Sequence, residues 1–275
     1  MSTVELGLML VVGLGTGVFG AMLGIGGGVL IIPILVLGLG IPIHATVAAS
    51  LVSIIATSSA AASVYLGNRV TNIRLGMALE TATAVGGMLG GIVAVSLGRG
   101  VLLALFAAVL VATAVSMWRR PEESPAQAQA QDEGHLGSHY HDPYLGRQVR
   151  YRVVRFPLGW GIALFAGVLS GLLGIGGGVV KVPTMVLGMG IPVKAAAATS
   201  DFMIGVTAVS SAYIYYAHGD LDVLVAAPLA AGAFLGSLAG AHLAPRLRSR
   251  VLTNVFAVLL AGVAVEMGLR AVGIF

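Results

Sequence analysis

Hydrophobic residues occur along this chain in long blocks, and short polar stretches separate one block from the next. Ten of these blocks have the length and apolar character of helices. They span residues 6–23, 28–38, 43–66, 75–97, 101–118, 158–173, 178–188, 193–217, 223–243 and 251–270. Most are long enough to cross a bilayer, since about 20 apolar residues span its hydrocarbon. The pattern predicts an all-α, polytopic transmembrane helical bundle with about 8 to 10 crossings.

The second half of the chain repeats the first. Residues 23–29 read Leu-Gly-Ile-Gly-Gly-Gly-Val, and residues 173–179 have the same sequence. An ungapped alignment of residues 23–50 with residues 173–200 gives 17 identities in 28 positions. Such self-similarity indicates two homologous repeats. Glycines break an apolar run at corresponding positions of both halves, and broken helices of this kind indicate the binding site of a transporter.

We divide the chain into a first transmembrane repeat (1–118), a polar linker (119–157) and a second transmembrane repeat (158–275). The first part of the linker has almost nothing to bury and is expected to be disordered. Its later part contains side chains that transition metals accept as ligands, namely Asp132, Glu133, His135, His139, His141 and Asp142. A solvated linker is the preferred interpretation, because no rigid scaffold is expected to hold these ligands in place. We therefore predict no metal site and no cofactor.

Composition agrees with a membrane protein: 57% of the residues are hydrophobic and 9% are charged, whereas soluble domains have about 25% charged residues. The formal net charge of +4 is expected to orient loops rather than to bind nucleic acid. If each repeat crosses the membrane an odd number of times, the repeats are inverted, and eleven of the 15 lysines and arginines face one side. The positive-inside rule favours this arrangement. We predict an inverted repeat with a cytoplasmic linker and both termini outside the cytoplasm.

The glycine breaks supply candidate backbone ligands. A helix that begins with glycines leaves its first amides unpaired, and the helix dipole adds partial positive charge at the same end. Such an end favours a small anion, which we expect to bind between the two breaks. The candidate ligands are Gly26, Gly27, Gly28, Gly176, Gly177 and Gly178. The alternative is that these glycines only allow neighbouring helices to pack closely.

Four polar side chains in the apolar segments complete the predicted site: Ser50, Lys181, Ser200 and Asp201. A lysine in a membrane helix is costly and therefore a functional candidate, although it could also extend to the membrane interface. The serines could donate to an oxyanion or to the backbone of their own helices. Asp201 could neutralise Lys181 or carry a coupling proton.

Three other charged residues within apolar segments are expected to have structural roles. Glu80 could pair with Arg74, and Glu266 with Arg270. For Lys194, its position at the start of a helix is a sufficient explanation.

The sequence resembles the sulfite exporter TauE/SafE family of membrane permeases. The resemblance rests on the doubled Gly-x-Gly-Gly-Gly-x4-Pro motif (24–33 and 174–183), the Ser-rich third helix, and the loop Gly219-Asp220-Leu221-Asp222. It covers nearly all of the chain except residues 121–146. The resemblance implies a multi-pass transporter in the bacterial plasma membrane, carrying small sulfur-containing anions such as sulfite, sulfoacetate or related organosulfonates.

We therefore interpret the chain as a secondary transporter, with a small anion and the lipid bilayer as partners. A coupling proton or sodium ion and a second copy of the chain are further partners that such a protein could use. The sequence has no Walker motif for direct use of ATP. An anion channel is the alternative, since both classes need polar groups inside the membrane. An intramembrane enzyme is disfavoured because no nucleophile–base pair or metal cluster is spaced on a helix.

Overall fold

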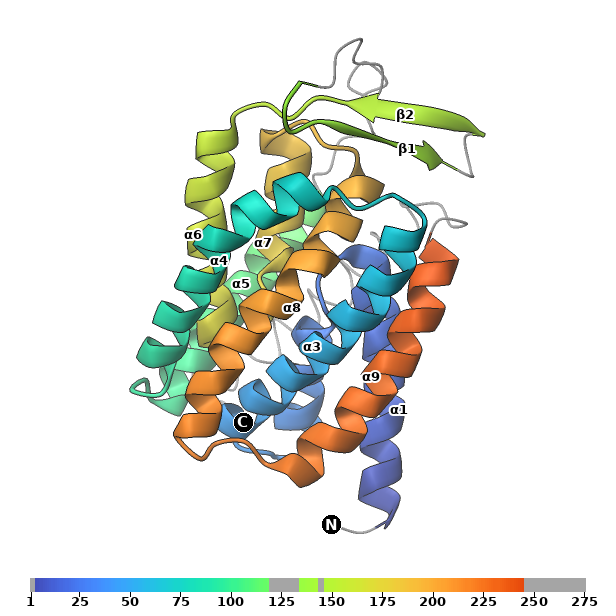
Figure 1. Ribbon diagram of the computed structural model, residues 1–275. Helices are drawn as coiled ribbons and strands as arrows, with labels where there is room; N and C mark the ends of the chain where they lie inside the picture. The colour runs from blue at the N-terminus through green and yellow to red at the C-terminus, as the bar shows by residue number, and fades with distance from the viewer. Residues whose placement is uncertain (1–2, 119–133, 143–145, 245–275) are drawn as a thin grey trace.

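The computed structural model describes residues 3–118, 134–142 and 146–244 (Figure 1). The first repeat contains α1 (Thr3–Leu23), α2 (Gly28–Pro33), η1 (Ile34–Gly38), α3 (Ile43–Gly67), α4 (Ile73–Ala94) and α5 (Arg99–Trp118). A hairpin of β1 (Ser138–Asp142) and β2 (Arg147–Tyr151) follows. The second repeat contains α6 (Phe156–Leu173), α7 (Gly178–Pro183), η2 (Thr184–Gly188), α8 (Val193–Ala217) and α9 (Val223–Leu243). The elements η1 and η2 are π-helical turns that continue α2 and α7.

The predicted helical bundle is confirmed for the described residues. Five of their helices are long and apolar enough to cross a membrane, while the segments 28–38 and 178–188 form shorter apolar helices. The helix predicted over 251–270, together with the pair of Glu266 and Arg270, lies outside the described residues. The β-hairpin is an addition to the predicted all-α fold.

The first helix of each repeat packs along the fourth helix of the other repeat. On α9, Gly232, Gly236 and Gly240 lie against the backbone of α1 at Leu10, Leu14 and Val18. In the same way, Gly86 and Gly90 of α4 lie against Leu164 and Val168 of α6. A Cβ added at Gly236 would lie 2.0 Å from the Leu14 carbonyl oxygen, so a side chain at this glycine would collide with the facing backbone. Small residues thus let these helices approach closely, as is common in membranes.

These contacts also define the direction of the helices. The glycines of α9 meet α1 in ascending order in both helices, so the two run parallel, and α4 and α6 are related in the same way. The two central helices α3 and α8 cross each other in opposite directions (Figure 1). The equivalent helices α3 and α8 therefore point in opposite directions. The inverted arrangement with respect to the membrane remains a prediction.

The linker hairpin packs over one end of the bundle (Figure 1). Its strands pair antiparallel, and every second residue is buried: Tyr140, Asp142, Val149 and Tyr151. The apolar members of this set join a core cluster that includes Met185 and Met189 of the second repeat. At the edge of the hairpin, Lys194 Nζ lies 2.8 and 3.0 Å from the two carboxylate oxygens of Asp142. The role of Lys194 is therefore an ion pair, which its helix-end position did not predict.

The histidines of the linker do not form a metal site in the described part of the chain. His139 and His141 are exposed on the outer face of β1. Among the described residues, no group of three or more His, Asp or Glu side chains is close enough to hold a metal ion. Asp132 and Glu133 lie outside the described residues. Residues 138–142 and 147–151 differ from the prediction in one respect: they pair as two strands with alternate residues buried, which gives this part of the linker a regular scaffold.

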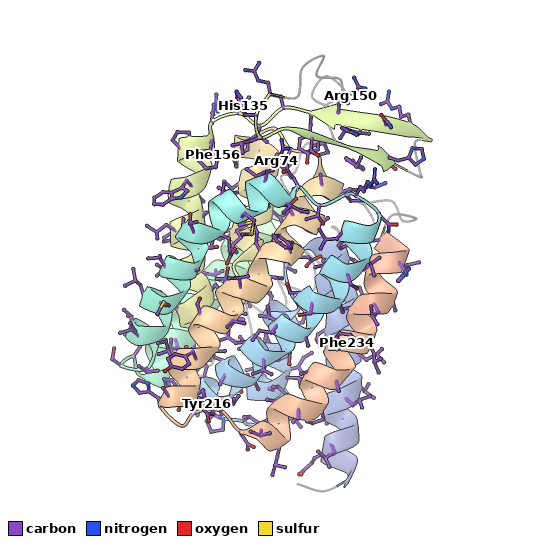
Figure 2. The ribbon with its side chains drawn as sticks, in the orientation of Figure 1. Arg74, His135, Arg150, Phe156, Tyr216 and Phe234 are labelled. Atoms are coloured by element: carbon purple, nitrogen blue, oxygen red, sulfur yellow. The ribbon has the colours of Figure 1, made fainter. Side chains whose placement is uncertain are left out.

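Basic side chains gather at the hairpin end of the bundle. Figure 2 shows Arg74, His135 and Arg150 at this end and Tyr216 at the opposite end. Other described arginines lie at the same end, because they are next to the end of α3, in or just after β2, or just before α6. They are Arg69, Arg147, Arg152 and Arg155. The opposite end has Arg99 together with the acidic residues Glu5, Asp220 and Asp222. We propose that the hairpin end faces the cytoplasm, following the positive-inside rule.

This orientation can be tested by labelling single cysteines, since the chain has none of its own. We expect Arg69→Cys to react with a membrane-impermeant maleimide only in inside-out vesicles. We expect Asp220→Cys to react in spheroplasts, because its loop lies at the acidic end. The reverse pattern would contradict the proposed orientation, and labelling of both positions from one side would contradict the helix directions.

Candidate functional site

The two predicted helix breaks are present and have matching backbone geometry. Gly27 and Gly177 precede α2 and α7 with φ angles of 77° and 72°. This left-handed conformation favours glycine, because a side chain there would crowd the backbone. Within the described residues, no acceptor receives a hydrogen bond from the amides of Gly177 and Gly178. These amides retain the donor capacity expected of an anion-binding helix start.

The breaks of the two repeats contact each other directly at the centre of the bundle. A Cβ on Gly28 would lie 2.4 Å from the carbonyl oxygen of Gly174, and one on Gly178 would lie 2.2 Å from that of Gly24. These two glycines are therefore needed for close packing, whatever else they do. For Gly28 and Gly178, this conformation agrees with the alternative that the glycines allow neighbouring helices to pack closely.

The predicted serines bridge the two repeats. Ser50 of α3 donates to the carbonyl of Gly174 across 2.8 Å, and Ser200 of α8 donates to the carbonyl of Gly24 across 2.6 Å. Both serines are fully buried. Their hydroxyl hydrogens are thus engaged with the carbonyls that the breaks leave open, and not with the carbonyls of their own helices. Each hydroxyl keeps acceptor capacity but has no second hydrogen to donate.

Two isoleucines occupy the space between the breaks. A Cβ on Gly26 would lie 2.7 Å from Ile204 Cδ1, and a Cβ on Gly176 would lie 3.3 Å from Ile54 Cγ2. Both isoleucine side chains are completely buried. In this conformation the breaks are closed by apolar packing. An anion can reach the space between them only if α3 and α8 move these side chains apart.

Lys181 lies within a buried polar cluster beside the second break. Its side chain is 1% exposed, and its Nζ donates to Thr207 Oγ1 across 2.9 Å. Thr207 in turn donates to Glu80 Oε1 across 2.8 Å, and Glu80 Oε2 lies 3.8 Å from the ammonium. The methylene stem of the lysine passes over Gly177, where a Cβ would lie 3.3 Å from Lys181 Cε. The alternative that Lys181 extends to the membrane interface does not describe this conformation, because its side chain is buried.

The cluster leaves hydrogen-bonding capacity unused. An ammonium has three donors, and within the described residues Lys181 makes one hydrogen bond. Glu80 Oε2 has no hydrogen-bond partner among them, and at 3.8 Å its contact with Lys181 is electrostatic. A buried cation with free donors can bind a small anion, provided that the new partner replaces the charge of the carboxylate.

Two predicted ion pairs are not formed. Glu80 does not pair with Arg74, whose side chain is exposed at the start of α4, while Glu80 is buried farther along the helix. Lys181 does not pair with Asp201 either. Both carboxylate oxygens of Asp201 are buried without a hydrogen-bond partner among the described residues. Asp201 is thus separate from the lysine cluster. Glu80 and Thr207 belong to the candidate site, although the sequence did not predict them as members of it.

The lysine cluster has no counterpart in the first repeat. The offset of 150 residues places Ile31 opposite Lys181 and Ala230 opposite Glu80, and only Thr57 preserves the third member. The serine–carbonyl contacts, by contrast, are duplicated. The shared frame is therefore symmetric, and the charged site is confined to the second repeat and the α4 helix packed on it.

Comparisons with known proteins agree with a membrane transporter. The family model described as Sulfite exporter TauE/SafE matches residues 9–267. The chain is 25% identical to the probable membrane transporter protein YunE of Bacillus subtilis, over 92% of this chain and 93% of the relative. It is also 25% identical to a probable membrane transporter protein of Methanocaldococcus jannaschii, over 92% of each chain. The probable membrane transporter protein MamO of Magnetospirillum gryphiswaldense is 28% identical over 61% of this chain and 29% of the relative. No solved structure is significantly similar.

The contact between the breaks predicts which glycines tolerate a side chain. Gly178→Ala places a methyl group against the Gly24 carbonyl and should destabilise the protein by about 1–3 kcal/mol, the usual range for overpacking. Gly188→Ala is the matched control, since its nearest new contact is Thr184 Cγ2 at 3.8 Å. Thermal unfolding in detergent measures the difference. Equal melting temperatures for the two variants would contradict the direct contact of the breaks.

Proposed function

The chain belongs to the sulfite exporter TauE/SafE family of membrane transporters, and on this premise we propose that it is a secondary transporter of a small sulfur-containing anion. The substrate class comprises sulfite, sulfoacetate and related organosulfonates. The observation that carries this proposal is the ammonium of Lys181, buried beside a helix break with unused donors. A buried lysine is costly in a membrane protein and indicates function rather than packing.

The chemistry of the cluster fits an oxyanion. Sulfite and sulfonate groups present several oxygens that accept hydrogen bonds from an ammonium, a hydroxyl and backbone amides at the same time. Lys181 supplies the ammonium, and the amides of Gly177 and Gly178 supply backbone donors. The Thr207 hydroxyl, whose one hydrogen is donated to Glu80, is proposed to donate to the anion only after the anion displaces that carboxylate. The α7 start adds the favourable dipole. Ser50, Ser200 and the first-repeat glycines Gly26, Gly27 and Gly28 are proposed to join once the breaks separate.

Glu80 acts in this proposal as an internal counter-ion. Without substrate it compensates the buried charge of Lys181 through the 3.8 Å contact and through Thr207. Removing one partner of a buried ion pair costs about 3–5 kcal/mol, so the lysine needs such a carboxylate in the empty state. A bound anion takes over this role, and the Glu80 carboxylate competes with it for Lys181.

Transport requires the centre of the bundle to open. Ile54 and Ile204 close the space between the breaks, and Ser50 and Ser200 hold the breaks together. We propose that α3 and α8 separate at this crossing, which exposes the lysine cluster to one side of the membrane at a time. The closed packing favours a carrier over an open anion channel. The proposed location is the bacterial plasma membrane, with the hairpin end in the cytoplasm and both termini outside it.

Two substitutions with opposite effects test the anion site. Lys181→Met keeps most of the length and the apolar stem but removes the ammonium, so sulfite or sulfoacetate should bind about ten- to a hundredfold more weakly. Glu80→Gln removes the competing carboxylate, so the empty protein should be less stable and the anion should raise its melting temperature more than in the wild type. Binding and thermal shift on purified protein measure both effects.

Lys194→Met is the matched control, because it removes the same charge from a lysine that pairs with Asp142 at the hairpin. It should bind the anions as the wild type does. Counterflow of radiolabelled sulfite in proteoliposomes should show the same order of variants. Wild-type binding and counterflow in Lys181→Met would contradict the proposed site.

A further inference from the structure

We propose that Glu80 takes up a proton each time the anion binds to Lys181, so that the protein carries one proton together with each singly charged anion. This inference rests on the proposed function and names its coupling ion. Three observations carry it: both charged side chains are buried, Glu80 Oε2 lies 3.8 Å from Lys181 Nζ, and the Thr207 hydroxyl contacts both residues.

The charges of the cluster are balanced in the empty protein. The side chains of Lys181 and Glu80 are 1% and 8% exposed, so water screens neither of them well. An anion that binds to the ammonium displaces the carboxylate and leaves one negative charge in excess. A buried charge without a partner is strongly unfavourable. Protonation of Glu80 removes the excess, because the displaced carboxylate is the group that has lost its partner.

Thr207 allows this exchange without leaving a polar group unpaired. In this conformation its hydroxyl accepts a hydrogen bond from Lys181 Nζ and donates to Glu80 Oε1. A hydroxyl has one hydrogen to donate and two acceptor sites. Once the carboxylate binds a proton from water at Oε1, the new O–H group can donate to Thr207 Oγ1. The Thr207 hydrogen is then available to the anion, so one hydrogen bond reverses its direction.

The charged groups on the elements around Glu80 leave Lys181 as its electrostatic partner. Helix α4 packs mainly on α6 and α8, and α6 has no titratable side chain. On α8, Lys194 pairs with Asp142, and Asp201 interacts with Tyr65 of α3. On α7, Lys181 interacts electrostatically with Glu80. Within the described residues, the charge on Glu80 therefore depends on what Lys181 binds.

The remaining titratable side chains of α4 and α8 do not alter this conclusion. Arg74 is exposed at the start of α4, and Tyr213 and Tyr216 are exposed on α8. The Tyr215 hydroxyl donates to the Gly171 carbonyl of α6 across 3.0 Å. On α4 itself, Thr83 donates to the backbone carbonyl of Glu80 and not to its carboxylate.

Coupling follows from which states of the cluster are neutral. The empty cluster is neutral when both side chains are ionised. The loaded cluster is neutral when the anion is bound to Lys181 and Glu80 is protonated. An anion without a proton, or a proton without an anion, leaves one uncompensated charge in the closed bundle. The bundle should therefore close with both or with neither, so the proton crosses with the anion and the empty protein returns without it.

Proton uptake on binding tests this inference in purified protein. The probe is methanesulfonate, which has a single charge and no group that titrates near neutral pH. Isothermal titration calorimetry of the wild type, in buffers of different ionisation enthalpy, should give about one proton taken up per anion bound. Where Glu80 is ionised in the empty protein, the dissociation constant should rise about tenfold for each unit of pH.

Glu80→Gln cannot take up this proton, so its proton uptake should fall to about zero and its dissociation constant should no longer depend on pH. Glu5→Gln is the matched control, because it makes the same substitution at an exposed position near the start of α1. It should keep the proton uptake of the wild type. With sulfite as a second probe, the difference between the wild type and Glu80→Gln removes the titration of sulfite itself.

Transport in proteoliposomes gives an independent measurement. One proton and one singly charged anion together carry no net charge. Proteoliposomes with a more acidic outside should therefore accumulate radiolabelled methanesulfonate, or radiolabelled sulfite, above the level of protein-free liposomes. A membrane potential set with potassium and valinomycin should not change this accumulation.

Several outcomes would overturn the inference. It fails if the wild type binds the probe without taking up a proton, if Glu80→Gln takes up as many protons as the wild type, or if a membrane potential or a sodium gradient drives accumulation and a pH gradient does not. Should Glu80→Gln not fold, the two wild-type measurements decide. Failure of the proposed function is distinguishable, because it appears as no binding of either probe to the wild type or as unchanged binding in Lys181→Met.

Discussion

A helix that breaks inside a bilayer leaves backbone carbonyls without partners, and lipid offers none. The arrangement of this bundle depends on how that requirement is met. Each break exposes one glycine carbonyl, and a serine of the opposite repeat donates to it: Ser50 to Gly174, and Ser200 to Gly24. Because each repeat satisfies the other, neither broken helix is complete alone. This close approach requires glycine at the contacting positions, because a side chain there would collide with the facing backbone.

This symmetric frame also contains charged residues that are not duplicated, namely Lys181 and Asp201 in the second repeat and Glu80 on α4 of the first repeat. Lys181 and Glu80 form a buried pair through Thr207, and Asp201 lies apart from them. Since these residues are buried, the charge of Lys181 is balanced within the cluster by the carboxylate of Glu80. The duplicated contacts thus account for the packing of the two breaks, while the proposed anion site consists of residues that are not duplicated.

Sequence patterns predicted the helices and the breaks well, because long apolar blocks and glycine runs are local signals. They did not predict which distant elements meet. The pairing of Glu80 with Arg74 was inferred from proximity in sequence, yet α4 packs on the opposite repeat and brings Glu80 to Lys181. The serine–carbonyl bonds join residues more than a hundred positions apart, so no local sequence pattern identifies the two partners. The hairpin was not predicted, although Tyr140, Val149 and Tyr151 alternate with polar or charged residues along its two strands.

The two breaks close against each other, and we propose that they must separate for an anion to pass. Ile54 and Ile204 occupy the closed contact from opposite helices, and the chain contains no cysteine that would interfere with thiol chemistry. Transport should therefore be measured in the double variant Ile54→Cys/Ile204→Cys before and after a short thiol crosslink, with each single variant as control. The crosslink should abolish counterflow, and reduction of a cleavable crosslink should restore it. Undiminished counterflow in the fully crosslinked protein would show that the breaks need not separate.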